Sequence, residues 1–309
     1  MLLPLYPDPA VRQQILEDAQ SAPIPDIQKE MFRFAERFVR NSWEMGPDDL
    51  ARLREAGLSE ADVVSWATLG STQSWFTMSA DGGGIPLEGD AAVGPGVGLT
   101  RERYEATAEG LLAPAIGEPV TAPTAPRSEV AWVGMDLESE GYREAARWAE
   151  DRYGFVPNLL RAASLQPGYY RRHLLALELL ERPQSEPLSG THHAMVRALV
   201  SQITRCTYSQ PTARALLARE CGDGAWDRIA AGEAVTDGDA QERVVLDFAA
   251  KVARNAYKVT EKDAQGFRDV GLDDAAYVDV LNTTSIQVAL DRMANALGVR
   301  PDGRPILPR

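Results

Sequence analysis

FAERFVRN at residues 34–41 and FAAKVARN at residues 248–255 are two versions of one segment, separated by 214 positions. At the same offset, residues 10–89 align with residues 224–303 without a gap. The identities outside the quoted segments include Asp49/Asp263, Arg54/Arg268, Gly57/Gly271, Ser71/Ser285, Gln73/Gln287 and Gly84/Gly298. A self-similarity of this length indicates two copies of one structural unit.

Apolar residues recur at helical spacing through most of the chain, as they do in both quoted segments. A run of alternating residues that would predict a sheet is missing, and the best candidate strand is the short segment Val130–Val133. We predict helices over residues 28–42, 47–56, from Ser59 onward, 100–112, 139–152, 158–164, 167–182, 188–204, 209–220, 225–231, 241–256, 261–270 and 273–297. The pattern therefore predicts an all-α fold.

Glycines mark helix ends at the same place in both copies. Gly57 and Gly271 follow the second helix of each copy, where the residue after a helix commonly needs a positive φ. Ser59 and Asp273 come next and are suitable N-caps for a third helix. We interpret these glycines as helix caps and not as ligand contacts.

The composition excludes several classes of protein. The 309 residues are 44% hydrophobic and 25% charged, with a formal net charge of −13. Nucleic-acid binding depends on basic patches, and the chain has no Lys/Arg-rich run, so we predict no nucleic-acid partner. An apolar run of the roughly 20 residues that cross a bilayer is also missing, so we predict no membrane association. Two cysteines make no disulfide framework, and the start lacks a secretory signal, which favours a cytoplasmic protein.

The chain divides at a segment rich in glycine and proline. Residues 81–127 contain Gly82-Gly83-Gly84, Gly94-Pro95-Gly96 and several prolines between Pro119 and Pro126, which is typical of a linker. We predict a first unit at residues 1–95, a linker at 96–128 and a second unit at 129–309. The offset of 214 makes residue 1 equivalent to position 215. The first unit is therefore a partial copy that corresponds to the C-terminal half of the second.

Short patterns follow one another in a fixed order. Tyr153–Leu159 reads YGFVPNL, Gln166-Pro167 precedes an apolar helix, and Leu199–Ser209 reads LVSQITRCTYS. Asp49–Ser59 reads DLARLREAGLS in the first copy, and Asp291-Arg292 precedes Ala-Leu-Gly-Val at residues 296–299. In order and spacing these patterns resemble the alkyl hydroperoxidase D-like (AhpD-like) superfamily, which includes γ-carboxymuconolactone decarboxylases and peroxidase-related proteins. The resemblance covers residues 130–303 fully and residues 10–89 in part.

The resemblance implies an all-α AhpD-like domain fused to a second, partial copy of the same helical unit. Members of this superfamily usually assemble as oligomers, so a homo-oligomer is an expected partner. The first copy lacks the helix that carries the cysteine motif. We expect the first copy to pack on the complete domain and to replace an oligomer contact.

The cysteine motif departs from the peroxidase pattern. That branch has a glutamate, then C-x-x-C, then a histidine, so that one thiolate attacks peroxide and the second resolves the sulfenic acid. Cys206 matches the first cysteine, but Ser209, Ala213 and Ala194 occupy the positions of the second cysteine, the histidine and the glutamate. Cys221 lies fifteen residues later across a predicted helix, about 20 Å away along its axis, too far for a disulfide. A two-cysteine peroxidase is therefore excluded.

The remaining candidate catalytic residues are Cys206, Ser209, His192 and His193. An imidazole transfers protons near neutral pH, and the two histidines flank the position of the missing glutamate. Consecutive helix residues point about 100° apart, so only one of them can face a pocket. The alternatives are a solvated first helix turn for both histidines, an N-cap role for Ser209 and a buried structural role for Cys206.

Four residues are candidate substrate contacts: Tyr208, Arg205, Gln202 and Arg292. The arginines suit a carboxylate best, because the guanidinium binds carboxylates in a bidentate fork. The chain lacks a metal-ligand spacing and a phosphate-binding glycine loop, so we predict neither a metal nor a cofactor.

Three functions remain open. The first is a cofactor-independent enzyme that performs acid–base chemistry, such as a decarboxylation, on a small organic substrate. The second is a one-cysteine thiol peroxidase that uses Cys206. The third is a non-catalytic binding or assembly protein. A perturbed histidine beside Ser209 favours the first, an accessible Cys206 with a lowered pKa favours the second, and a filled core around Cys206 favours the third.

Overall fold

The structure is a computed structural model that describes residues 6, 8–85, 128–166, 188–233 and 240–307. Within these ranges the chain forms helices, turns and bends and has no β-strand, as predicted. The helices are α1 (Pro9–Asp18), α2 (Asp26–Asn41), η1 (Ser42–Glu44), α3 (Pro47–Glu55), α4 (Glu60–Gly82), α6 (Glu140–Tyr153), α7 (Asn158–Ala162), α9 (Gly190–Ile203), α10 (Gln210–Cys221), α11 (Ala225–Ala231), α12 (Ala240–Asn255), η3 (Ala256–Lys258), α13 (Glu261–Asp269) and α14 (Asp274–Leu297). The predicted helices at 100–112 and 167–182 lie outside the described residues.

The offset that aligns the sequence also aligns the helix bounds. Adding 214 to the bounds of α2, η1 and α3 gives the bounds of α12, η3 and α13. Helices α4 and α14 start at equivalent residues, and α14 ends one position later. We call α2–α4 (residues 26–82) the first segment and α12–α14 (residues 240–297) the second segment.

Equivalent side chains make equivalent local contacts. Asp49 accepts a hydrogen bond from the Gly46 backbone N–H at the start of α3, and it pairs with Arg37 of α2. Asp263 does the same at the start of α13, where it pairs with Lys251 of α12 at 2.7 Å. A carboxylate at the third helical residue that reaches back to the N-cap satisfies a backbone donor which the helix leaves open. Equivalent aspartates, Asp49 and Asp263, therefore position the short helices α3 and α13.

The predicted caps are confirmed. Gly57 and Gly271 have φ angles of 109° and 81°, which an L side chain rarely adopts. Ser59 accepts a hydrogen bond from the backbone N–H of Asp62, and Asp273 accepts one from Ala276. These caps set the start of α4 and α14, the two longest helices among the described residues.

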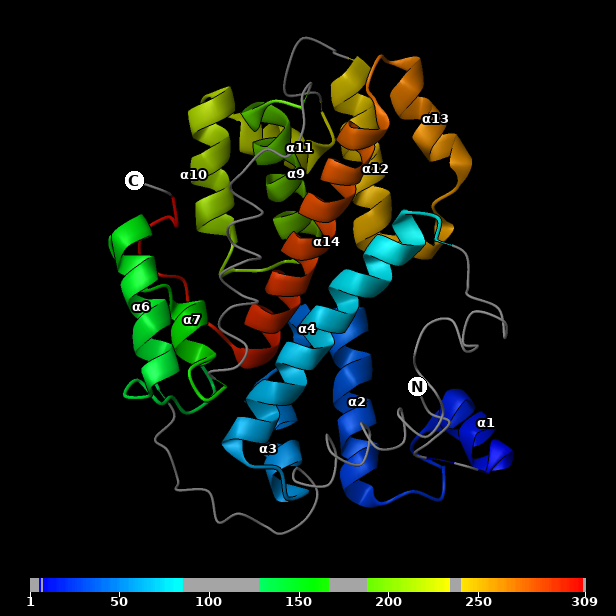
Figure 1. Cartoon of the computed structure of the whole chain (residues 1–309), viewed down its shortest axis with the longest axis vertical. Helices are drawn as coiled ribbons and strands as arrows, with labels where there is room; N and C mark the ends of the chain where they lie inside the picture. The colour runs from blue at the N-terminus through cyan, green and yellow to red at the C-terminus, as the bar shows by residue number, and fades with distance from the viewer. Residues whose placement is uncertain (1–5, 7, 86–127, 167–187, 234–239, 308–309) are drawn as a thin grey trace.

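The two segments pack against each other through α4 and α14, the most extensive helix pair among the described residues. Figure 1 shows α14 through the middle of the molecule with α4 crossing beside it. The contacts are reciprocal, because α4 also packs on η3 of the second segment and α14 packs on η1 of the first. The largest apolar cluster joins Phe38 and Leu53 of the first segment to Met293 and Leu297 of the second. The segments therefore share one core across the predicted boundary at residues 96–128.

The remaining helices cover the two sides of this pair. Helix α9 packs on α12 and α14 of the second segment and α10 packs on α9, while α6 and α7 lie near the C-terminal end of α14 (Figure 1). The candidate strand Val130–Val133 forms bends, so that prediction was wrong. Its backbone wraps the end of α14 instead, where Trp132 N–H donates to the Leu297 carbonyl at 2.8 Å. Helix α1 was not predicted. No helix among the described residues has the length and the apolar content to cross a bilayer.

Candidate functional site

The turn between α9 and α10 places the cysteine motif. The N–H of Cys206 donates to the Ser201 carbonyl and that of Arg205 donates to Gln202, which closes α9 with the paired bonds of a Schellman motif. Arg205 takes the left-handed position with φ of 51°, where glycine is the usual residue. Its guanidinium lies 5.4 Å from the ring centroid of Trp43 in the first segment. Backbone strain of this kind is concentrated at functional sites, which makes this turn a candidate site.

Cys206 is a buried thiol. Its exposed fraction is 0%, and it belongs to the apolar cluster that the two segments share. Burial raises the pKa of the Cys206 thiol well above its usual value, and the nearby Asp291 carboxylate raises it further. The structure thus gives Cys206 neither access nor a lowered pKa, and both are required for a reactive thiolate.

Ser209 contacts a carboxylate that the sequence analysis did not select. The Ser209 hydroxyl donates to Asp291 Oδ1 and lies 3.5 Å from the Cys206 sulfur. It makes no capping bond to α10, although Ser209 occupies the N-cap position, so the expected capping role was wrong. The hydroxyl donates instead to the buried carboxylate, and a hydrogen bond to a charged acceptor is stronger than one between neutral groups.

Asp291 is the centre of a buried polar cluster. Thr204 Oγ1 donates to Asp291 Oδ2 at 2.6 Å, and Gln287 Nε2 donates to Oδ1 at 2.7 Å. Burial raises the pKa of Asp291 to about 6, against the hydrogen bonds from Ser209, Thr204 and Gln287, which favour the charged form. This carboxyl therefore exchanges a proton near neutral pH.

His193 lies in a different cluster. Its Nε2 is 2.8 Å from Asp279 Oδ2, its Nδ1 is 3.2 Å from Thr283 Oγ1, and all three side chains are buried. Asp279 and Asp291 are both on α14, 12 residues apart, which corresponds to about 18 Å along the axis. The predicted grouping of His193 with Cys206 and Ser209 is therefore wrong.

His192 has a structural role. Its Nδ1 is 3.1 Å from the Ser189 hydroxyl, in a capping box at the start of α9. The expectation that at most one of the two histidines can face inward holds, since His193 is buried and His192 is at the helix start. Neither of them lies beside Ser209.

Tyr208 is buried next to the start of α7. Its hydroxyl accepts a hydrogen bond from the backbone N–H of Leu159 at 3.4 Å. Burial raises the pKa of Tyr208 well above its usual value, and the charge of Asp302 raises it further. Tyr208 therefore ties the N-terminus of α7 to the core, and it does not line the cavity that the other three candidates share.

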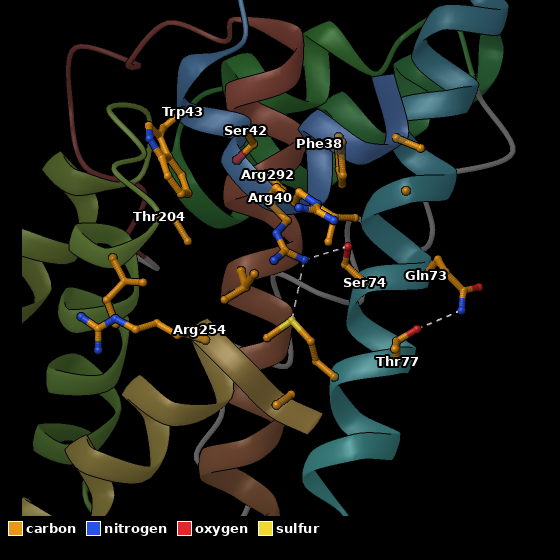
Figure 2. A pocket seen from close by; sticks show the side chains of 18 of the residues that line it. Phe38, Arg40, Ser42, Trp43, Gln73, Ser74, Thr77, Thr204, Arg254 and Arg292 are labelled. Carbon is orange, nitrogen blue, oxygen red and sulfur yellow. Dashed lines mark hydrogen bonds between the residues drawn. The ribbon is translucent and has the colours of Figure 1, made fainter. Parts of the chain in front are cut away.

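That cavity lies between the two segments. It has a volume of about 1200 Å³ and is bounded by α2, η1, α4, α9, α12, η3 and α14. Three of the four predicted substrate contacts line it: Gln202, Arg205 and Arg292. Its wall is mainly apolar, with contributions from Phe32, Phe34, Phe38, Val39, Trp43, Trp66, Leu69, Met78, Val252, Tyr257 and Val288. We call it the interface pocket; Figure 2 shows a part of its wall.

Arg292 extends into the interface pocket from α14. Its Nη1 donates to Ser74 Oγ at 3.1 Å and lies 4.0 Å from the Met78 sulfur, as the dashed lines in Figure 2 show. Burial lowers the pKa of Arg292 to about 10, so the group stays charged at neutral pH. The two side chains that Arg292 contacts among the described residues, Ser74 and Met78, are both uncharged.

Thr204 links the pocket to the Asp291 cluster. Its side chain lines the interface pocket, and the same hydroxyl donates to Asp291. Thr204 belongs to the LVSQITRCTYS segment but was not among the four predicted substrate contacts. The described residues contain no group of three His, Cys, Asp or Glu side chains that could hold a metal ion.

Two solved structures have a similar fold. One is an uncharacterized peroxidase-related protein from Silicibacter sp. TM1040, with 24% identity and a TM-score of 0.50 over 58% of this chain and 96% of that chain. The other is described as an alkylhydroperoxidase AhpD core, an uncharacterized peroxidase-related protein from Ralstonia eutropha JMP134. It has 23% identity and a TM-score of 0.51 over 59% of this chain and all of that chain.

No protein-family model matches the sequence, and no curated protein matches it. At 24% and 23% sequence identity, the two structures show the fold of this chain and not its function. Over somewhat less than three fifths of its length, the chain therefore has the all-helical AhpD-like fold.

Proposed function

We propose that this protein binds a small organic molecule in the interface pocket, and that this pocket, not the Cys206 thiol, is its functional centre. The observation that carries the proposal is the position of Gln202, Arg205 and Arg292, which all line the pocket. Clefts of several hundred Å³ with apolar walls and a few polar groups are typical small-molecule sites.

The surface chemistry of the pocket supports the same function. Val39, Leu69 and Tyr257 line it with exposed fractions of 50%, 44% and 69%. A folded chain gains free energy by covering apolar surface, so a group of large apolar side chains left in contact with solvent indicates an interaction site. The two segments contribute these side chains together.

The peroxidase alternative has less support. Peroxide reduction starts with attack by an accessible thiolate. Cys206 is fully buried, and both burial and Asp291 raise its pKa. A one-cysteine peroxidase would need the opposite arrangement.

Acid–base chemistry on the bound molecule is a second candidate, and one observation favours it. Thr204 lines the pocket, and its hydroxyl donates to Asp291, whose pKa is raised to about 6. A hydroxyl in this position can pass a proton to a ligand while it takes one from the carboxyl group, as a general acid does. A decarboxylase-like step on a small organic acid would use such a proton at the carbon that loses carbon dioxide. In this version Asp291 replaces the histidines as the proton-transfer group.

Binding can be tested with N-phenyl-1-naphthylamine, a neutral dye that fluoresces in apolar sites. We expect a saturable signal with one site per chain. Leu69→Asp places a charge in the apolar wall and should weaken binding roughly tenfold. Phe76→Asp is the matched control, because Phe76 is 58% exposed on the same helix and does not line the pocket.

A peroxide assay completes the test. With excess dithiothreitol, the parent protein and Cys206→Ser should both show background consumption of hydrogen peroxide. Absence of dye binding would reject the proposed pocket. Turnover that disappears in Cys206→Ser would replace the proposal with the one-cysteine peroxidase.

A further inference from the structure

The interface pocket lies on the axis that relates the two segments. Its wall contains equivalent residues from both segments: Phe38/Val252, Val39/Ala253, Arg40/Arg254, Ser42/Ala256, Trp43/Tyr257, Ser74/Val288 and Met78/Arg292. The last pair is in contact, with 4.0 Å between the Arg292 nitrogen and the Met78 sulfur. Two equivalent residues that touch each other must lie next to the symmetry axis, as in an isologous dimer interface. The pocket is therefore built by both segments about a common centre.

At this centre the two segments differ in chemistry. The second segment supplies a guanidinium at position 292, where the first supplies the thioether of Met78. The first supplies a hydroxyl at position 74, where the second supplies Val288. Arg292 and Ser74 hydrogen-bond to each other, so the polar members of both pairs meet on one side of the axis. The centre of the pocket therefore offers a ligand one polar end and one apolar end.

The charged side chains that line the pocket are mainly positive. Four arginines line it, Arg40, Arg205, Arg254 and Arg292, and Asp81 is the one carboxylate among its lining residues. The protein as a whole has a formal net charge of −13, so this concentration of arginine opposes the overall balance. A cluster of positive charge in a cleft with apolar walls raises the local concentration of anions.

The arginines have different environments. Arg40, Arg205 and Arg254 are exposed, and Arg40 pairs with Glu36 of the same helix at 3.3 Å. Arg292 is the most enclosed of the four, and its recorded contacts among the described residues are with Ser74 and Met78. An enclosed guanidinium without a recorded carboxylate partner retains hydrogen-bond donors for a ligand, and it binds a carboxylate best through two parallel N–H donors.

Together, these observations define a ligand class. We propose that the interface pocket binds an amphipathic organic monoanion in one orientation, with its carboxylate on Arg292 and its apolar body along the aromatic and aliphatic wall. This inference rests on the proposed function, since it names the chemistry of the molecule that the same pocket takes.

The experiment compares decanoate with decan-1-ol, which share an apolar chain and differ in the charged head. Binding to the full-length protein is measured by displacement of N-phenyl-1-naphthylamine. We expect the parent protein to prefer decanoate by about 10-fold to 100-fold, the range for a charge-assisted hydrogen-bonded pair. Arg292→Met installs the residue that the first segment has at this position, and it should remove the preference while decan-1-ol binds as before.

Two further variants make the result specific. Arg40→Met removes an arginine of the same pocket that is exposed and paired with Glu36, so the preference for decanoate should persist. Arg292→Lys keeps the charge without the planar fork and should retain a reduced preference, which also covers the case in which Arg292→Met does not fold.

The outcomes separate the two proposals. If the dye and decan-1-ol bind but the parent protein does not prefer decanoate, the anion site is rejected and the small-molecule pocket stands. The anion site is also rejected if Arg292→Met keeps the full preference. If none of the three probes binds, the proposed function itself is rejected.

Discussion

Arg292 and Met78 occupy equivalent positions 214 residues apart in the two segments, and the guanidinium of one lies 4.0 Å from the sulfur of the other. This contact places the axis between the segments at the interface pocket. The first segment thus provides α14 with the type of surface that a second subunit would provide in a symmetric dimer. Because the segments have different residues at the centre, a single chain gains what a homodimer cannot have, a pocket with two unlike ends.

The two thiols should differ strongly in reactivity. Cys206 is fully buried, whereas Cys221 is partly exposed at the end of α10. With 5,5′-dithiobis(2-nitrobenzoate) at pH 8.5, we expect one thiol to react in the native protein and the second to react only after unfolding. Cys221→Ser should abolish the native reaction. Rapid modification of Cys206 in that variant would show that the core opens around it, and it would revive the peroxidase alternative.

A cysteine introduced at position 209 should allow a disulfide with Cys206 but should not produce peroxidase activity. The Ser209 hydroxyl oxygen lies 3.5 Å from the Cys206 sulfur, so the sulfurs in Ser209→Cys can approach bonding distance after a small adjustment. Diamide should then remove both thiols from a count made in denaturant. Asp291 remains next to both sulfurs, and a carboxylate beside a thiol disfavours the thiolate.

We therefore expect the Ser209→Cys protein to consume peroxide at the background rate in the presence of dithiothreitol. The double variant Cys206→Ser/Ser209→Cys is the control for reaction of the new thiol alone. Peroxide turnover well above background in Ser209→Cys would show that Asp291 does not suppress the thiolate.

Asp291 should leave a signature in the pH dependence of stability. Burial raises its pKa from 3.8 to about 6 in the folded protein, so the native state holds this proton more tightly than the unfolded chain. The contribution of Asp291 to the free energy of unfolding is therefore complete below about pH 4, falls between about pH 4 and 6 and is level above that range. A shift of about two units corresponds to about 3 kcal/mol.

The variant Asp291→Asn isolates this contribution. Relative to the parent, its free energy of unfolding in urea should rise by up to about 3 kcal/mol between pH 4 and 7. Asp302, whose pKa burial also raises to about 6, is present in both proteins and cancels in the difference. Asp274→Asn, at the exposed start of α14, is the control for loss of a charge from the same helix. A difference that stays constant with pH would mean that Asp291 does not titrate in this range.

Local features of the fold were predictable, and contacts between distant residues were not. The helix bounds follow from spacing, caps and glycines within a few residues, and the repeat supplied those of the two segments twice. The site depends on contacts such as Ser209 with Asp291, 82 residues apart, and His193 with Asp279, 86 residues apart. Nothing in the local sequence indicates which buried carboxylate each of these residues meets, because helix packing decides it.

Three of the four candidate substrate contacts lie together and the candidate catalytic residues do not, for a physical reason. Gln202 and Arg205 adjoin the turn after α9, and Arg292 lies one position after the carboxylate that this turn contacts, so one region holds all three. The catalytic set joined residues from both ends of α9. His193 is ten residues before Ile203, the last residue of that helix, and a straight helix keeps its two ends apart.

The two copies also provide a matched test of close packing. Gly84 and Gly298 are equivalent, and their φ angles of 63° and 62° are almost the same. A Cβ at Gly298 would lie 2.0 Å from the Trp132 ring, whereas one at Gly84 would meet nothing within 4 Å. Gly84→Ala should therefore cost only the left-handed strain, about 1 kcal/mol. Gly298→Ala must also displace the indole and should cost about 3 kcal/mol or more in urea unfolding. Equal decreases in the free energy of unfolding would show that the segment around Trp132 moves aside at no cost. That segment would then not hold the end of α14.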